Sequence, residues 1–205
     1  MIALIDYGAG NVRSVHKALE AVGAEVQITR DPDLTLTADK VVLPGVGAFG
    51  DCMAGLRRAG LVDALHRVVQ MGRPLLGICV GMQVLFEEGE ELGFHAGLGL
   101  LPGRVVRFAG DLAANGYKIP HTGWNQIEPI AQDPLFDDLS PGAWAYFNHA
   151  YYCQARPEQI LAVTDYGLAF PSVVGQGQVY GIQFHPEKSQ QVGLHILRNF
   201  VERVK

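Results

Sequence analysis

Short apolar runs alternate with amphipathic segments in the first half of the chain. Four runs have the length and composition of buried strands and occupy residues 2–6, 25–29, 40–43 and 75–78. Apolar positions at helical spacing follow three of these runs, over residues 12–22, about 50–70 and about 80–88. This alternation predicts a mostly parallel central sheet flanked by helices, with ligands at the carboxyl ends of its strands.

The second half of the chain replaces this alternation with short β-rich runs. They lie at residues 105–108, 124–129, 143–152, 160–164, 172–174 and 179–184. Such runs favour antiparallel strands. An amphipathic helix over residues 191–204 is expected to cover the sheet, and turns are expected at residues 109–111 and 114–116. The sequence therefore predicts an α/β fold with additional antiparallel strands in its C-terminal half.

Composition favours one domain over residues 1–205. The chain has 205 residues, of which 48% are hydrophobic and 18% charged, enough to bury a substantial core. No repeat, low-complexity tract or Pro/Ser-rich linker divides it. Residues 1–6 fit a first strand better than a signal peptide, and no apolar stretch is long enough to cross a bilayer.

Charge and cysteine content narrow the range of partners, cofactors and cellular compartments expected for the chain. A net charge of -5 provides no general attraction to nucleic acid or to an anionic membrane, so neither is expected as a partner. Cys52, Cys79 and Cys153 are widely spaced without a CxxC pattern, which argues against a disulfide framework or a zinc site. We expect a reducing cytoplasm, no metal and no cofactor.

The segment LLGICVGMQ at residues 75–83 has the pattern of a nucleophile elbow around Cys79. Glycines two residues before and after the cysteine remove the Cβ atoms that would collide in a sharp strand-to-helix turn. Amide groups at the start of the following helix would favour a thiolate and could hold an oxyanion. An isolated cysteine is more often buried and inert, and the flanking glycines shift the balance toward chemistry.

Two other segments supply groups that a thiol nucleophile needs. In FHPEKS, residues 184–189, strand periodicity places His185 and Glu187 on one side, so that the carboxylate can orient an imidazole that accepts the thiol proton. PGVG at residues 44–47 follows an apolar run, and its glycines free the backbone to present N–H groups to an oxyanion. Alone, a glycine-rich loop of this kind fits phosphate binding or a plain turn equally well.

These motifs carry a resemblance to a known family. GICVGMQ, PGVG and FHPEKS, with this spacing, resemble the class I, triad-type glutamine amidotransferases over nearly the whole chain. Within that family, DYGAGN, VRSVHKALE, PHTGWN and YFNHAYY are similar to the glutaminase subunit of imidazole glycerol phosphate synthase. The resemblance implies the amidotransferase fold and hydrolysis of glutamine to glutamate and ammonia for histidine biosynthesis.

By this resemblance Cys79 is the nucleophile, His185 the general base and acid, and Glu187 the orienting carboxylate. A glutamyl thioester would form and be hydrolysed. The positions that match oxyanion and glutamine contacts are Val46, Gly47, Val80, Gln83, His149 and Ala150. Many relatives have a hydroxyl residue where Ala150 stands, so main-chain recognition is expected there without a side-chain hydrogen bond.

The resemblance also implies a separate (β/α)8 cyclase subunit, with which the chain forms a heterodimer and to which it supplies ammonia. Asn11, Trp124 and Tyr146 match positions near that interface, although such an Asn is often a helix cap and such aromatic residues are often core. Two other functions stay open. One is a different cysteine glutaminase or γ-glutamyl hydrolase, and the other is a non-catalytic binding module of the same fold.

Overall fold

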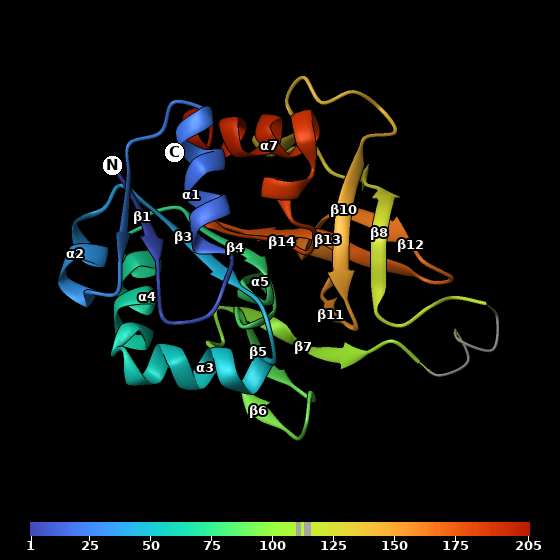
Figure 1. The fold of residues 1–205 in the computed structure, drawn as a ribbon, viewed down its shortest axis with the longest axis horizontal. Helices are drawn as coiled ribbons and strands as arrows, with labels where there is room; N and C mark the ends of the chain where they lie inside the picture. The colour runs from blue at the N-terminus through green and yellow to red at the C-terminus, as the bar shows by residue number, and fades with distance from the viewer. Residues whose placement is uncertain (110–111, 113–115) are drawn as a thin grey trace.

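An eight-stranded sheet runs through the centre of the computed structural model, which describes residues 1–109, 112 and 116–205 (Figure 1). In spatial order its strands are β2 (Val26–Thr29), β1 (Ile2–Ile5), β3 (Lys40–Gly45), β4 (Leu75–Cys79), β14 (Val179–Ile182), β13 (Ala169–Gln176), β12 (Ile160–Asp165) and β9 (Glu128–Pro129). The turns expected at residues 109–111 and 114–116 include positions outside the described residues and stay predictions.

The sheet joins a parallel half to an antiparallel half. Strands β2, β1, β3, β4 and β14 are parallel, whereas β13, β12 and β9 continue the sheet in antiparallel fashion. Strand β14 comes late in the chain but lies beside β4, with Ile182 opposite Ile78. This confirms the predicted α/β class and brings the segment after β14 next to the elbow after β4.

Helices cover both faces of the parallel half. In the described residues the α-helices are α1 (Val12–Ala21), α2 (Pro32–Thr37), α3 (Phe49–Arg58), α4 (Leu61–Gln70), α5 (Val80–Gln83) and α7 (Gln190–Glu202). The same residues contain three short 3₁₀ turns, η1 (Pro134–Phe136), η2 (Pro157–Gln159) and η3 (Pro186–Lys188). Figure 1 shows α1 and α7 above the sheet and α3 and α4 below it, so the apolar strands between them are buried.

Two smaller sheets of the described residues lie outside the main sheet. Strand β8 (His121–Gln126) pairs with β10 (Trp144–His149), and the order β11 (Tyr151–Ala155), β7 (Leu101–Arg107), β5 (Phe86–Gly89), β6 (His95–Ala96) makes the other. The single run expected at residues 143–152 is thus two strands in different sheets, with Ala150 between them. The sequence could not show this break because both strands are β-rich.

Two helix predictions were wrong in detail. The helix expected over residues 80–88 is one turn long, because Phe86 at the end of its apolar run pairs with Leu101 of β7. An apolar run this short fits either a helix or a strand, and pairing with β7 decides for the strand. The helix expected over residues 50–70 is divided into α3 and α4 by Gly60, whose φ of 68° is a left-handed conformation that ends a helix.

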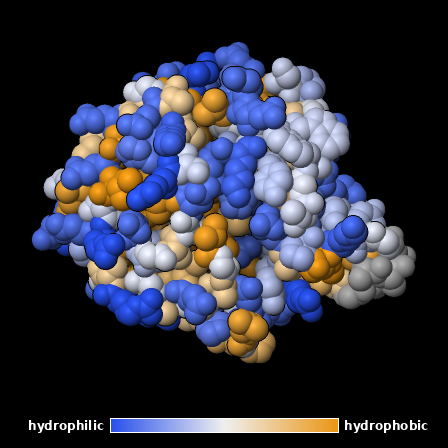
Figure 2. Space-filling view, viewed as in Figure 1, coloured by the Kyte–Doolittle hydropathy of each residue, from blue (hydrophilic) through white to orange (hydrophobic). Residues whose placement is uncertain are grey.

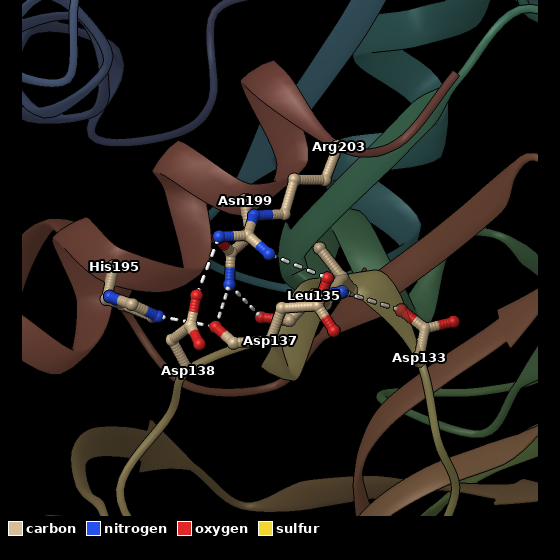
Figure 3. Close-up of polar contacts among 7 residues, drawn as sticks. All are labelled: Asp133, Leu135, Asp137, Asp138, His195, Asn199 and Arg203. Carbon is tan, nitrogen blue, oxygen red and sulfur yellow. Dashed lines mark hydrogen bonds and ion pairs between the residues drawn. The ribbon is translucent and has the colours of Figure 1, made fainter.

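A cluster of polar contacts fastens α7 to the segment around η1 (Figure 3). The buried Asn199 amide donates to the carbonyl oxygens of Leu135 at 3.0 Å and Asp137 at 2.8 Å. At the surface, the Arg203 guanidinium donates to the carboxylates of Asp137 and Asp138. The final helix is therefore held by hydrogen bonds as well as by its apolar face.

The surface is mixed in polarity (Figure 2). An orange projection at its lower edge lies where Figure 1 places the turn between β5 and β6. That turn carries Leu92 and Phe94, which are 88% and 81% exposed. No helix in the described part of the chain is long and apolar enough to span a membrane.

Candidate active site

Cys79 stands at a strained turn between β4 and α5. Its φ of 56° and ψ of -115° are unusual for a non-glycine residue, and they confirm the predicted elbow. The flanking glycines are required: a Cβ on Gly77 would lie 2.5 Å from the Gly81 oxygen, and one on Gly81 would lie 1.9 Å from the Leu43 oxygen. The elbow can form because these two glycines have no side chain, so neighbouring backbone atoms occupy the space that a Cβ would need.

A cavity of about 320 Å³ opens beside Cys79. Every residue assigned from the sequence to the oxyanion or to glutamine lines this cavity. Its wall consists of Val46, Gly47, Cys79, Val80, Gln83, Glu91, Pro120, Asn148, His149, Ala150, Tyr151, His185 and Lys188. The structure thus brings together segments that are far apart in the chain, in a space large enough for an amino-acid side chain and its backbone groups.

His185 and Glu187 form a buried pair next to the thiol. The Nδ1 atom of His185 lies 3.0 Å from Oε1 of Glu187, and their side chains are 3% and 0% exposed. The juxtaposition predicted from the sequence is confirmed, but the strand geometry given for it was wrong. Only His185 is extended, and Glu187 lies in the 3₁₀ turn η3, where Pro186 begins the turn. The turn brings the carboxylate back toward the ring.

The protonation of His185 reflects competing effects. Burial alone would lower its pKa, but hydrogen bonds to Cys79 and Glu187 and electrostatic interactions with these two groups outweigh burial and raise the pKa to about 9. The imidazole is therefore a cation at neutral pH. With Nδ1 facing Glu187, Nε2 is the nitrogen left for the thiol and for a leaving group.

The backbone of His185 is fixed on both sides. Its N–H donates to the Tyr146 carbonyl at 2.9 Å, and its carbonyl accepts a 2.6 Å hydrogen bond from the Ser189 hydroxyl. The same Ser189 oxygen accepts from the Tyr146 N–H at 2.9 Å. Sequence reasoning missed this role of Ser189. A small hydroxyl residue four positions after the candidate histidine was the available signal.

Two buried glutamines support the elbow. The Gln83 amide nitrogen donates to the Tyr151 carbonyl at 3.1 Å and to Oε1 of Gln183 at 3.0 Å, so only its own Oε1 is left for a ligand. Gln183, which sequence reasoning missed, places its amide nitrogen 3.9 Å from the Cys79 sulfur. It precedes His185 by two residues in an apolar run, and an amide buried in such a run needs a partner.

Two histidines form a relay behind the cavity. Because His149 Nδ1 donates to the Tyr151 carbonyl at 2.8 Å, its Nε2 must accept from Nδ1 of His121 at 3.1 Å. Nε2 of His121 then accepts from Asn125 at 3.3 Å. Burial lowers the pKa of His149 to about 3 and that of His121 to about 4, so both rings are neutral. The relay fixes the main chain at residues 149–151, which lines the cavity.

Glu91 is the acidic residue of the cavity that sequence reasoning missed. One carboxylate oxygen accepts a 2.8 Å hydrogen bond from the Phe49 N–H, which caps the otherwise uncapped start of α3. The residue follows β5 and reaches the cavity from the turn that leads to β6. The acidic run after the elbow was the available signal, but its fold into a strand and turn was not predicted.

The three interface candidates lie near His185 and Glu187, Asn11 and Tyr146 by direct contact and Trp124 through Tyr146. Asn11 does not cap α1 with its side chain; its amide donates to Oε1 of Glu187 at 3.4 Å. Trp124 is 44% exposed, and its ring meets that of Tyr146 edge-on at 6.2 Å. The Tyr146 ring is also 6.4 Å from His185. Trp124 is therefore at the surface and Tyr146 is half-buried beside the site, and neither belongs to the buried core.

This arrangement has the groups that acyl transfer by a thiol requires. It combines a cysteine at a strained turn, an imidazole with a raised pKa and a buried carboxylate. Among the described residues, no cluster of three or more His, Cys, Asp or Glu side chains could hold a metal ion.

Comparisons with known proteins agree on one family. The model of the family described as glutamine amidotransferase class-I matches residues 3–204. Two similar proteins are imidazole glycerol phosphate synthase subunits HisH, from Syntrophotalea carbinolica at 52% identity and from Geobacter sulfurreducens at 48%; each alignment covers 98% of both chains. A solved glutamine amidotransferase has a TM-score of 0.76 at 22% identity, covering 98% of this chain and 99% of its own.

Proposed function

Because the chain belongs to the class-I glutamine amidotransferase family, we propose that Cys79, His185 and Glu187 form the triad with which it hydrolyses glutamine. The chain acts as the glutaminase subunit of imidazole glycerol phosphate synthase, in histidine biosynthesis. The observation that carries the triad is the buried His185–Glu187 pair beside a cysteine in a strained elbow.

The first half of the reaction releases ammonia. The Cys79 sulfur attacks the carboxamide carbon of glutamine, and the carbonyl oxygen becomes an oxyanion that accepts hydrogen bonds from main-chain amides of Val46, Gly47 and Val80. When the oxyanion collapses, the C–N bond breaks, and the His185 imidazolium gives its Nε2 proton to the leaving nitrogen. Ammonia leaves, and the glutamyl group stays on sulfur as a thioester.

The second half regenerates the enzyme. Neutral His185 now accepts a proton from water, the hydroxyl attacks the thioester, and the same amides hold the second oxyanion. Collapse breaks the C–S bond, so that glutamate leaves and the thiolate–imidazolium pair is restored. Glu187 stabilises the imidazolium in both halves because its oxygen lies 3.0 Å from Nδ1.

The amino-acid end of glutamine fits the polar wall of the cavity. The Glu91 carboxylate is suited to its ammonium group, and Oε1 of Gln83 and the main chain at His149 and Ala150 supply further hydrogen-bonding groups. Lys188, also in the wall, can meet its carboxylate. These groups favour a substrate whose α-ammonium and α-carboxylate groups are both free.

The partner is a (β/α)8 cyclase subunit that consumes the ammonia, with which this chain forms a heterodimer. The exposed Trp124 and the half-buried Tyr146, which lies between it and His185, are suited to that interface. Ammonia that enters bulk water at neutral pH becomes ammonium, so release next to the partner protects it.

The test is glutamate formation from glutamine by the chain alone, and by the chain with the cyclase and its nucleotide substrate. We expect low activity alone and strong stimulation in the complex. Cys79→Ala should abolish hydrolysis and still co-purify with the cyclase. Hydrolysis that is insensitive to the cyclase would argue against the synthase assignment, and hydrolysis by Cys79→Ala would refute the nucleophile.

A further inference from the structure

Two buried side chains lie behind the 44–47 turn, which comprises the last two residues of β3 and the two that follow it, and they have no part in the hydrolysis described above. Tyr7 follows β1 and is 7% exposed, and Cys52 lies in the first turn of α3 and is fully buried. The thiol and the phenol adjoin one another. On its other side the 44–47 turn presents Val46 and Gly47 to the cavity beside Cys79.

Each of these side chains holds a carbonyl of the turn. The Tyr7 hydroxyl donates to the Pro44 carbonyl at 2.9 Å, and the Cys52 thiol donates to the Val46 carbonyl, with sulfur and oxygen 3.6 Å apart. A trans peptide is planar, and its N–H points opposite to its C=O. The Val46 carbonyl shares a peptide unit with the Gly47 N–H, so the thiol directs that N–H away from α3.

Both groups keep the hydrogen that they donate. Burial, the largest cause, raises the pKa of Cys52 to about 11 and the pKa of Tyr7 well above its ordinary value. The turn also has little freedom to translate. A Cβ on Gly45 would lie 2.5 Å from the Gly81 nitrogen and 3.0 Å from the Tyr7 hydroxyl, so the turn is wedged between the elbow and Tyr7.

We propose that Tyr7 and Cys52 are positioning residues that set the orientation of the 44–47 turn, with Cys52 aiming the Gly47 N–H at the oxyanion. The proposal rests on the glutaminase function and deepens it. Neither side chain lines the cavity. They act through the main chain, and their removal should impair the steps in which an oxyanion forms.

The experiment compares Cys52→Ala, Cys52→Ser and Tyr7→Phe with wild type in the complex with the cyclase and its nucleotide. Cys153→Ala is the matched control, because it removes another fully buried thiol, which lies on β11 opposite Val105 of β7 and not on α3. For Cys52→Ala we expect kcat to fall about tenfold with the glutamine KM nearly unchanged, less than the loss of a whole oxyanion donor. Cys52→Ser should recover most of kcat, because its hydroxyl is also a donor.

A second measurement distinguishes an effect on the orientation of the turn from a general loss of Cys79 reactivity. Iodoacetamide alkylates Cys79 by displacing iodide at a CH2 carbon, so no oxyanion forms, and its rate reports the thiolate alone. We expect alkylation rates close to wild type in all four variants. The double variant Cys52→Ala with Tyr7→Phe should lose less than the product of the single losses, since both act on one turn.

The outcomes are distinguishable. If wild type hydrolyses glutamine and Cys52→Ala keeps its kcat, this inference is overturned and the proposed function stands. Alkylation that slows in proportion to kcat, or a serine variant as slow as the alanine variant, also overturns it. If wild type is inactive even with the cyclase, the proposed function itself fails. Circular dichroism checks folding, and the near-isosteric serine variant keeps the test valid if alanine unfolds the chain.

Discussion

Acid should destabilise this protein through the relay of His121 and His149. The two residues are 3% and 6% exposed and packed among aromatic side chains, and each ring donates one hydrogen bond and accepts one. Protonating His149 would place a second hydrogen on Nε2, where it faces the hydrogen that His121 donates. The folded state therefore resists a proton that the unfolded chain accepts readily.

The magnitude follows from the pKa values. Burial lowers the pKa of His149 to about 3, whereas an unfolded His has a pKa of about 6.5. A lowered pKa contributes stability that is present above pH 6.5 and is lost as pH falls toward 3, because the unfolded chain binds more protons in that range. At about 1.4 kcal/mol per pH unit, moving from pH 7 to pH 5 costs about 2 kcal/mol through His149. His121 acts in the same direction.

His185 acts in the opposite direction at higher pH. Its pKa is raised to about 9 in the folded state, so its contribution to stability is complete below pH 6.5 and is lost as pH rises through about 9. The two effects together place the maximum of stability near pH 6.5 to 7. Urea unfolding followed by circular dichroism at pH 5, 6, 7, 8 and 9 would measure this curve.

The variant His149→Asn isolates the relay. An asparagine amide can still donate to the Tyr151 carbonyl but does not titrate, so the variant should be less stable at pH 7 and lose about 2 kcal/mol less than wild type between pH 7 and 5. Cys153→Ala should lower stability equally at both pH values and serves as the control. The reasoning is refuted if His149→Asn and wild type lose the same stability on acidification.

Three further predictions concern the triad, the cavity and the last helix. Glu187→Gln removes the charge beside Nδ1, so the pKa of His185 should fall and kcat should drop about ten- to hundredfold; a pH–rate profile with an unshifted limb would contradict this. Glu91→Gln should raise the glutamine KM about tenfold with kcat largely kept, because it loses the charge facing the substrate ammonium; a kcat effect alone would count against that contact. Asn199→Ala leaves the buried Leu135 carbonyl without its donor, while the Asp137 carbonyl keeps its contact with the His195 ring, and should lower the free energy of unfolding by about 1–2 kcal/mol in urea titrations; a change under 0.5 kcal/mol would show that the bond is replaced.

Local pattern was enough to predict the sheet and the elbow. Strand–helix alternation predicted the parallel half because each buried strand reads as a continuous apolar run, and β1, β3 and β4 match those runs within one or two residues. Gly77 and Gly81 marked the elbow because few other demands place two glycines so close to a cysteine. In these places local sequence and tertiary structure impose the same requirement.

Prediction failed where a distant segment decides the local conformation. Residues 84–88 leave the helix because β7, which begins at Leu101, pairs with them. Glu187 faces His185 because of a 3₁₀ turn and not because of strand alternation. Glu91 enters the cavity through a turn and a cap on α3 that depend on Phe49, 42 residues earlier. Single-sequence periodicity carries no information about such partners.

Backbone contacts set the distance between Cys79 and the 44–47 turn. A Cβ on Gly81 would lie 1.9 Å from the Leu43 oxygen, and one on Gly45 would lie 2.5 Å from the Gly81 nitrogen. The elbow and the end of β3 therefore contact each other through main-chain atoms. No side chain of the described residues lies between them that could change its rotamer and relieve the contact. Strain of about 1–3 kcal/mol at Cys79 persists because that contact prevents the backbone of the elbow from adopting another conformation. Cys79 and the end of β3 are consequently held at a fixed separation by the backbone itself.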